Sequence, residues 1–310
     1  MSLVFFGTPA FAATVLEAMI SSGMKPDLVV TATDKPAGRG RSTRPSEVRC
    51  LAEAAGLKLL VTNDVNSHES ISIIAQMNPA IGVTAAFGQI LSPSVLSLFS
   101  VGSFNVHGSL LPDYRGASPI QWALLDGSEK TGVTTFMMNE GIDLGSILLQ
   151  KQCPIDPDDD YTILHHRLAI MGGELAVSTV RGLRDGTLKS VPQSRRGKYC
   201  RRFTKKDGLL DFSMSAERLV NRVRGLNPWP GTYTFFRGKK LAILKAHRID
   251  GEPIGAEPGV ISAVDPAKGF SVNTGDGAIL LLRLKLEGKG EVSGQQFVSG
   301  YRPLPGEVLG

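Results

Sequence analysis

The segment Leu3-Val-Phe-Phe-Gly-Thr-Pro-Ala-Phe11 is a short apolar run that stops at a glycine and a proline and leads into an amphipathic stretch. This order of residues predicts a buried strand, a tight turn and a helix, the repeating unit of an alternating α/β fold. Similar units follow along the chain. We expect strands at 3–6, 28–31, 80–84, 102–106, 131–137 and 147–150, and helices at 11–21, 46–55, 67–77, 119–125 and 161–182. Residues 1–190 are therefore predicted to form a doubly wound, mainly parallel sheet with helices on its faces.

The pattern changes after Val191. Short apolar runs separated by Gly and Pro turns predict strands at 232–236, 241–249, 259–263, 270–274 and 278–286. One amphipathic helix is expected at 215–226, because Ser215 is a good N-cap and Glu217 lies in the first turn. This half of the chain is predicted to be a small OB-like β-barrel. The expected division is a first domain at 1–190, a basic linker at 191–206 and a second domain at 207–310.

The composition is that of an ordinary globular protein, with 310 residues, 42% hydrophobic and 20% charged. Roughly 150 residues per domain suggests two domains, and fibrous or mainly disordered classes are excluded. Apolar stretches such as 278–282 are far shorter than the roughly 20 residues that cross a bilayer. The N-terminus lacks the basic start of a secretory signal, so we expect a cytoplasmic protein with no membrane partner. Cys50, Cys153 and Cys200 are too scattered for a disulfide framework or a zinc site.

The formal net charge of +5 is distributed unevenly along the chain. Residues 1–190 contain 14 basic and 18 acidic residues, whereas residues 191–310 contain 20 basic and 11 acidic residues. The most basic segment, 194–206, has seven Lys and Arg interleaved with Tyr199 and Phe203. Such a composition suits phosphates and base stacking. The C-terminal half is therefore predicted to bind RNA or another polyanion, and a solvated linker is the alternative for the basic segment.

The turn after the first expected strand is a candidate ligand site. Backbone amides at Gly7 and the following helix N-terminus favour an anion or a polar ligand. A dinucleotide-binding fingerprint needs three glycines in the order G-x-G-x-x-G, and only Gly7 is present here. A nicotinamide cofactor is therefore not expected.

Asn105 and His107 form the most informative pair of polar residues. Their spacing on an expected strand places both side chains on one face, at the carboxyl end where open α/β sheets bind ligands. An amide can donate to a developing oxyanion, and an imidazole can take a proton near neutral pH. The pair therefore suits attack of an amine on an acyl carbon. Taken alone, His107 is equally consistent with a structural histidine.

Asp143 lies in the glycine-containing loop 138–145 that follows the next expected strand. Such a loop can bring the carboxylate beside a neighbouring strand end, where it would orient and polarise His107. The alternative is an ordinary turn aspartate. The acidic run at 156–160 resembles a metal site, but a solvated loop and helix start is the better interpretation, because negative charge is stabilised at a helix N-terminus. No metal is expected.

Several motifs, taken in order, resemble the methionyl-tRNA formyltransferase family, and the resemblance covers nearly the whole chain. They are Phe6-Gly-Thr-Pro9, Asp34-Lys-Pro-Ala-Gly-Arg-Gly40, Phe87-Gly-Gln-Ile-Leu91, Asn105 with His107, Ser109-Leu-Leu-Pro112, Arg115-Gly-Ala-Ser-Pro-Ile-Gln121, residues 138–145 and Leu226-Asn-Pro-Trp-Pro230. The resemblance implies a Rossmann-like formyltransferase domain followed by an OB-like barrel that helps to hold tRNA. The implied reaction transfers the formyl group of 10-formyltetrahydrofolate to the α-amino group of methionyl initiator tRNA, for translation initiation.

The resemblance also implies roles for individual residues. Asn105, His107 and Asp143 match the family's catalytic trio. Folate contacts are expected at Phe87, Gly88, Gln89, Ile90, Ser109, Leu110, Leu111 and Pro112. Contacts with tRNA are expected at Arg39, Arg41 and Arg44, in a loop that could instead be only a mobile surface loop, and at Arg201, Arg202, Lys205 and Lys206.

Two residues depart from the family's pattern. Gly108 stands where Ala is usual, and Asp113 occupies a position that is commonly basic. Relatives that formylate glycinamide ribonucleotide or a sugar amine, or that hydrolyse the formyl group, are rival interpretations, as is a non-catalytic RNA-binding protein. The short basic C-terminal half and the intact trio favour the tRNA enzyme over all of these. A monomer is expected.

Overall fold

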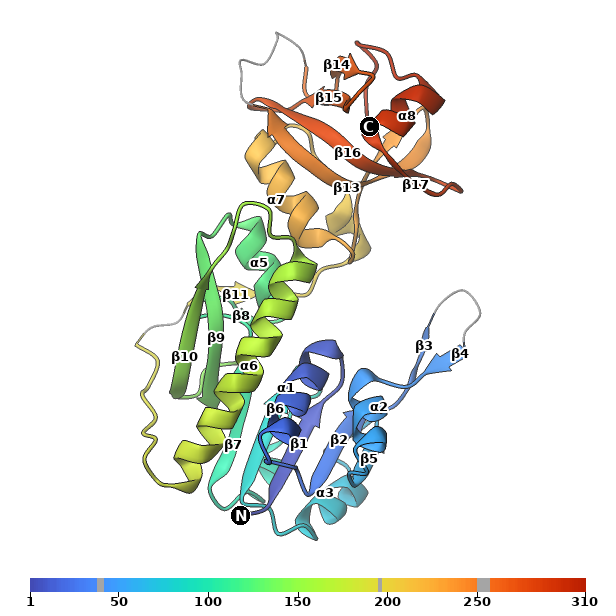
Figure 1. The fold of residues 1–310 in the computed structure, drawn as a ribbon. Coiled ribbons are helices and arrows are strands. Elements are labelled where there is room, and N and C mark those ends of the chain that lie inside the picture. Colours follow the sequence, from blue (N-terminus) through green and yellow to red (C-terminus); the bar gives the residue numbers. More distant parts are fainter. Residues whose placement is uncertain (38–41, 195–196, 250–256) are drawn as a thin grey trace. The chain divides into compact units, whose positions relative to one another are not determined.

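The first half of the chain is built on a seven-stranded sheet in the order β10-β9-β7-β6-β1-β2-β5 (Figure 1). The strands are β1 (Leu3–Gly7), β2 (Leu28–Ala32), β5 (Leu59–Thr62), β6 (Ile81–Ala85), β7 (Gly102–His107), β9 (Lys130–Met137) and β10 (Ile147–Pro154). The five strands β5, β2, β1, β6 and β7, which follow one another across the sheet, are parallel. Strand β9 pairs antiparallel with β7, and β10 pairs antiparallel with β9. The predicted mainly parallel sheet is therefore confirmed.

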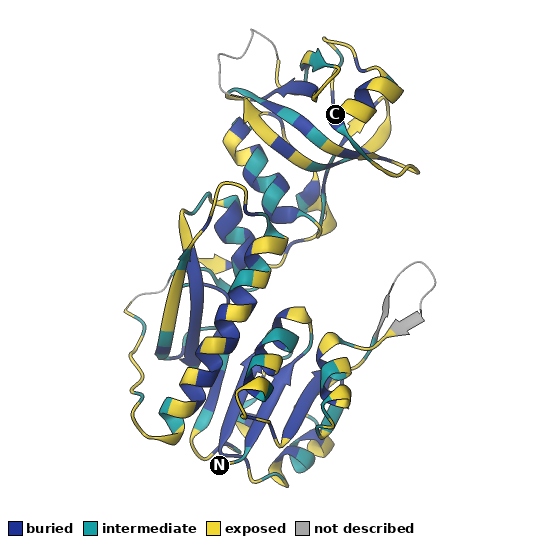
Figure 2. Ribbon diagram, viewed as in Figure 1, coloured by how far each residue is buried: buried dark blue, intermediate teal, exposed yellow. Residues whose placement is uncertain are grey.

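Helices cover both faces of this sheet. They are α1 (Ala10–Ser21), α2 (Glu47–Ala54), α3 (His68–Ala75), α4 (Pro93–Leu96) and α6 (Tyr161–Arg184). The helix α5 (Pro119–Leu125) belongs, apart from Pro119, to the second unit described below. On one face, Phe6 packs with α3 and α4 in a single apolar cluster. On the other face, Val106 and Phe11 of α1 lie close to Gly172 of α6. The central strands β1, β2 and β6 are almost fully buried, whereas the edge strand β10 is largely exposed (Figure 2). Burial on both faces explains the continuous apolar sequences of the central strands.

The order in which the parallel strands are added to the sheet changes direction beside β1. The chain moves from β1 to β2 and β5 on one side, and then to β6 and β7 on the other side. The carboxyl ends of β1, β6 and β7, at Gly7, Ala85 and His107, lie at one edge of the sheet. In open α/β sheets this switch point is where ligands bind.

The structure is a computed structural model that describes residues 1–37, 42–194, 197–249 and 257–310. It contains two units. The first comprises Met1–Pro119, Lys130–Pro154 and His165–Cys200, and the second comprises Ile120–Glu129, Ile155–Leu164 and Arg201–Gly310. The first unit also contains two small sheets: β3 (Lys35–Ala37) with β4 (Ser42–Arg44), and β8 (Arg115–Gly116) with β11 (Tyr199–Cys200).

Across the described ranges, no helix is both long enough and apolar enough to pass through a membrane.

The second unit contains an antiparallel six-stranded sheet. Its strands are β12 (Thr232–Phe236), β13 (Lys239–Ile249), β14 (Ile261–Asp265), β15 (Gly269–Asn273), β16 (Ala278–Leu286) and β17 (Glu291–Ser293), and its helical elements are η1 (Lys205–Gly208), α7 (Ala216–Leu226) and α8 (Gly294–Tyr301). The strand order is β12-β13-β16-β15-β14, with β17 on β16. Within the described residues no hydrogen-bonded pairing joins the two edge strands, β12 and β14. The sheet is therefore not closed, and the expected barrel is not established.

An aromatic cluster lies at the centre of the second unit. Phe297 of α8 is fully buried and contacts Phe236, Phe270 and Tyr301, with ring centroids 5.4, 5.5 and 4.6 Å away. Its position explains why α8 packs on the sheet although Gly294 and Gly300 weaken the helix. The helix is held by burial and by the capping box of Ser293 and Gln296.

The Phe297→Ala variant tests this core. We expect a loss of about 3–5 kcal/mol of unfolding free energy, because the substitution removes a buried ring and leaves a cavity. Both tryptophans, Trp122 and Trp229, lie in the second unit, so tryptophan fluorescence in a urea titration reports its unfolding. Phe235→Ala is the matched control, because Phe235 is 37% exposed. Equal losses in the two variants would contradict the assignment of Phe297 to the core.

Candidate active site

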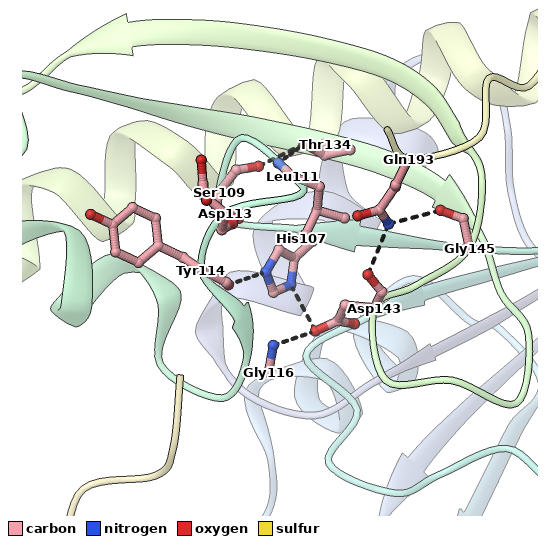
Figure 3. Close-up of polar contacts among 10 residues, drawn as sticks. All are labelled: His107, Ser109, Leu111, Asp113, Tyr114, Gly116, Thr134, Asp143, Gly145 and Gln193. Carbon is pink, nitrogen blue, oxygen red and sulfur yellow. Dashed lines mark hydrogen bonds and ion pairs between the residues drawn. The ribbon is translucent and has the colours of Figure 1, made fainter. Parts of the chain in front are cut away.

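The His107 side chain is held at the carboxyl end of β7. Only 6% of the residue is exposed, and its Nε2 lies 2.8 Å from the carbonyl oxygen of Tyr114 (Figure 3). A carbonyl oxygen can only accept, so Nε2 carries the hydrogen and donates it. Nδ1 is then the nitrogen that is able to accept a proton. The tautomer of His107 therefore follows from its position beside Tyr114.

Asp143 stands on the Nδ1 side of this ring. Its Oδ2 lies 3.7 Å from His107 Nδ1 and accepts a 2.7 Å hydrogen bond from the Gly116 backbone N–H. The first distance fits a charge partner and is too long for a hydrogen bond. The sequence suggested that Asp143 itself orients the imidazole, but the hydrogen bond that does so comes from the Tyr114 carbonyl. Asp143 supplies a negative charge beside the free nitrogen.

The loop that contains Asp143 folds back to reach His107. Strand β9 runs antiparallel to β7, so its end at Met137 lies beside Phe104 near the start of β7. The loop must therefore return along β7 to bring Asp143 to His107. Gly145 permits this path, since a Cβ at that position would lie 1.5 Å from the Met137 carbonyl oxygen. Asp143 itself has a left-handed backbone with φ of 51°, a conformation that costs about 1–3 kcal/mol outside glycine.

Asn105 lies two residues before His107 on β7 and is partly buried. The alternation of a strand places its side chain on the same face as that of His107. It pairs with Thr84 of β6 and with Phe136 of β9. Among the described residues, the Asn105 amide makes no hydrogen bond. The amide is therefore uncommitted, as a donor to substrate must be.

The stretch from Ser109 to Pro112 is fixed by its neighbours. Thr134 Oγ1 donates to the Ser109 carbonyl at 2.7 Å and accepts from the Leu111 N–H at 3.0 Å. Gln150 Nε2 donates to the Leu111 carbonyl at 2.8 Å, and Ser109 Oγ donates to the Asp113 carbonyl at 2.7 Å. Asp113, which departs from the family's pattern, thus contributes its backbone to the loop. The backbone of the loop is therefore held by four hydrogen bonds to neighbouring groups.

The stretch Phe87 to Ile90 contributes to the same edge in a different way. Phe87 belongs to the apolar cluster around Phe6, and Gly88 has a left-handed φ of 83°. The Gln89 amide bridges the Val65 N–H and the Thr62 carbonyl, so it is occupied within the protein. Ile90 is 73% exposed. Of these side chains, Ile90 is the one presented to solvent.

The described basic residues that are expected to contact tRNA belong to two different units. Arg39 and Arg41 are outside the described residues, and Arg44 is exposed at the end of β4 in the first unit. Arg201, Arg202, Lys205 and Lys206 are exposed in the second unit. The structure therefore brings His107 and Asp143 together, with Asn105 two residues before His107 on β7.

Arg201 is already paired within the protein. Its guanidinium binds both carboxylate oxygens of Asp207 and lies over the rings of Trp122 and Phe203. These two rings stack with centroids 4.9 Å apart. The Arg201 hydrogen bond, with further bonds from Thr204, holds the pKa of the Asp207 carboxyl well below its usual range. Arg201 is therefore a structural clamp at the start of the second unit.

The acidic run at 156–160 forms a loop and a helix start. Asp159 Oδ2 accepts from the Asp156 N–H, and Asp160 Oδ1 accepts from the Ile163 N–H at the start of α6. Across the described residues, no group of three or more His, Cys, Asp and Glu side chains is arranged to hold a metal ion. Cys50, Cys153 and Cys200 form no disulfide with one another.

Several residues around the trio gave no signal in the sequence. Tyr114 and Gly116 act through backbone atoms, which any residue type possesses. Thr134 and Gln193 act through side chains, but their partners are distant in the chain. Spacing rules apply within one element, so they do not reveal such contacts.

Comparison with known proteins agrees with this architecture. Residues 1–180 match the formyl transferase family, and residues 202–302 match the formyl transferase C-terminal domain. An N-formyltransferase from Helicobacter canadensis, solved with folinic acid and dTDP-3-aminofucose, has a TM-score of 0.67 at 20% identity, over 91% of this chain and 98% of that one. HypX from Aquifex aeolicus has a TM-score of 0.65 at 14% identity, over 97% of this chain and 49% of that one. These two likenesses show the fold.

The sequence relatives are more specific. A methionyl-tRNA formyltransferase from Citrifermentans bemidjiense is 40% identical over 100% of this chain and 96% of its own length. One from Symbiobacterium thermophilum is 40% identical over 97% of this chain and 92% of its own length. With matches of this extent along both halves, the chain belongs to the methionyl-tRNA formyltransferase family.

Proposed function

We propose that the protein transfers the formyl group of 10-formyltetrahydrofolate to the α-amino group of methionyl initiator tRNA. The observation that carries this proposal is the constellation at the end of β7. A proton-accepting Nδ1 of His107 faces the Asp143 carboxylate, and the uncommitted Asn105 amide lies on the same face of the strand. Such a site suits acyl transfer to an amine, and the relatives' names specify the acceptor.

The roles of His107 and Asp143 follow from the tautomer. The α-amino nitrogen forms a bond to the formyl carbon, and the bond from that carbon to folate N10 breaks. The nitrogen gives up a proton, and His107 Nδ1 is the nitrogen able to take it and pass it to the leaving N10. The resulting imidazolium stands beside the Asp143 carboxylate, which stabilises its charge. The Tyr114 carbonyl keeps Nε2–H engaged throughout.

Asn105 is proposed to stabilise the oxyanion. When the amine adds to the formyl carbon, negative charge develops on the formyl oxygen, and a preorganised amide donor lowers the energy of that state. The hydrogen-bonded loop Ser109–Pro112 and the exposed Ile90 side chain are proposed to hold the folate donor at the same edge of the sheet. Because this loop is already hydrogen-bonded, little ordering is required when the donor binds.

The second half of the chain is proposed to hold the tRNA. The division proposed is a catalytic domain at 1–190, a linker at 191–206 and an OB-like domain at 207–310, in line with the opposite charges of the two halves. Arg39, Arg41, Arg44, Arg202, Lys205 and Lys206 are proposed as phosphate contacts, with Arg201 acting through its clamp on Asp207. We further propose that the protein works in the cytoplasm as a monomer.

The His107→Ala variant tests the catalytic assignment. We expect formyl transfer to methionyl initiator tRNA to be lost, because no group remains to take the amine proton, while tRNA affinity stays within about twofold. His68→Ala is the control, since His68 is exposed on α3. The assay compares both variants with wild type, with free methionine and an amino-sugar nucleotide as alternative acceptors. Preference of the wild type for the sugar acceptor would refute the proposed substrate.

The Asn105→Ala variant separates oxyanion stabilisation from proton transfer. Removing one oxyanion donor typically costs about 100- to 1,000-fold in rate. We therefore expect kcat to fall by about that factor while turnover remains measurable, and KM for both substrates to change little. Single-turnover rates provide the measurement. An unchanged kcat would show that Asn105 does not contact the reacting oxygen.

A triple variant tests the basic residues. Replacing Arg202, Lys205 and Lys206 by Gln removes three exposed charges, and each phosphate contact contributes roughly 0.7 to 0.9 to the slope of log affinity against log salt. We expect weaker tRNA binding and a slope smaller by about two. Arg201→Gln is the comparison, and because Arg201 is paired with Asp207 it should change the slope less than the triple variant does. A triple variant with the wild-type slope would rule out these phosphate contacts.

A further inference from the structure

Gln193 makes two hydrogen bonds to the loop that contains Asp143. Its Nε2 donates to the carbonyl oxygens of Asp143 and Gly145, each at 2.9 Å (Figure 3). Gln193 follows α6 and lies between the ranges matched by the two formyl transferase families, 1–180 and 202–302. A residue from outside both matched ranges thus holds the backbone of the proposed catalytic aspartate.

The chemistry of the contact requires a primary amide. Two carbonyl oxygens on either side of Leu144 converge on one nitrogen, and an amide –NH2 offers a hydrogen to each without adding charge. The Gln193 Oε1 atom is buried and has no hydrogen-bond partner among the described residues. The side chain is therefore held by its two donor bonds.

Residues just after Gln193 hold the opposite side of the site. Arg115 N–H donates to the Lys198 carbonyl, and Ala117 N–H donates to the Cys200 carbonyl, each at 2.9 Å. Between these two anchors lie the Tyr114 carbonyl and the Gly116 N–H, which contact His107 and Asp143.

Gly197 passes close to the folate-binding loop. A Cβ at this position would lie 1.9 Å from the Pro112 carbonyl oxygen, so the path of the chain requires glycine there. Gln193 and residues 197–200 therefore contact the Asp143 loop, the segment 115–117 and the end of the Ser109–Pro112 loop.

We propose that Gln193 and residues 197–200 form a positioning segment for the catalytic site, with Gln193 as the positioning residue of Asp143. This inference rests on the proposed function, because it assumes that Asp143 polarises His107. The positioning segment runs directly into Arg202, Lys205 and Lys206, the proposed tRNA contacts. One stretch of chain thus connects the tRNA contacts to the catalytic geometry.

The Gln193→Met variant tests the proposal. It keeps the length of the side chain and removes both donors. We expect kcat to fall by about 10- to 100-fold, the size of effect that misplacing a catalytic group by about 1 Å produces. KM for 10-formyltetrahydrofolate and for methionyl initiator tRNA should stay within about twofold. Gln152→Met is the matched control, because Gln152 is exposed on β10, and it should retain the wild-type kcat.

A charge substitution gives a second readout. In Gln193→Glu the introduced carboxylate faces two carbonyl oxygens and cannot donate while it is ionised. Its kcat relative to wild type should rise as pH is lowered from about 8 to about 5.5, because the protonated acid can donate one hydrogen bond. Gln193→Met should show no such rise. A ratio for Gln193→Glu that is flat with pH would overturn the proposed donor role.

A double-mutant cycle with Asp143→Asn distinguishes the possible failures. If Gln193 acts through Asp143, Gln193→Met should reduce kcat by less than about twofold when Asp143→Asn is already present. If the two substitutions reduce kcat independently, so that their fold-losses multiply in the double variant, the positioning role is overturned. It is also overturned if Gln193→Met keeps the wild-type kcat while Asp143→Asn loses most of it. Full activity of Asp143→Asn would instead refute the catalytic role of Asp143 in the proposed function.

Discussion

The hydrogen bond from His107 Nε2 to the Tyr114 carbonyl is the constraint on which the site depends. It commits one ring nitrogen to the protein and leaves Nδ1 as the proton acceptor, on the side where Asp143 stands. The bond is possible because the chain reverses after β7 with Tyr114 in a left-handed conformation, at φ of 58°. The unusual backbone at one residue thus determines which nitrogen of His107 is left able to accept a proton.

The sequence was most informative where burial imposes a regular pattern. The strands from Leu3 and Leu28 and the helix to Arg184 were predicted to within a few residues, because a sheet covered on both faces requires continuous apolar runs. The strand β5 (Leu59–Thr62) was missed, since it is a short, partly buried edge strand. The helix α8 (Gly294–Tyr301) was missed because its two glycines oppose helix formation and tertiary packing of Phe297 overrides them.

The candidate site was predictable in its residue types but not in its geometry. Asn105 and His107 share a face by strand alternation, and the structure places them so. The position of Asp143 was correctly expected to be near His107, although β9 is antiparallel and the loop has to fold back to reach it. The contacts of Gly116 and Gln193 involve backbone atoms and distant partners, which no local pattern encodes. The pairing of Arg201 with Asp207 was hidden for the same reason, so part of the formal charge of the basic segment is neutralised by a neighbouring carboxylate.

The base of the Asp143 loop has a consequence for dynamics. The Met137 N–H donates to the Ser146 carbonyl at 2.9 Å, so the two ends of the loop are joined where β9 passes into β10. A loop closed at its base can detach from its neighbours while the sheet beneath it stays intact, and such local openings have their own free energies, separate from global unfolding. The free energy of such an opening would be set by the few bonds that hold Asp143, from Gly116 and Gln193. Changes in these bonds can therefore alter the position of Asp143 while the stability of the sheet stays the same.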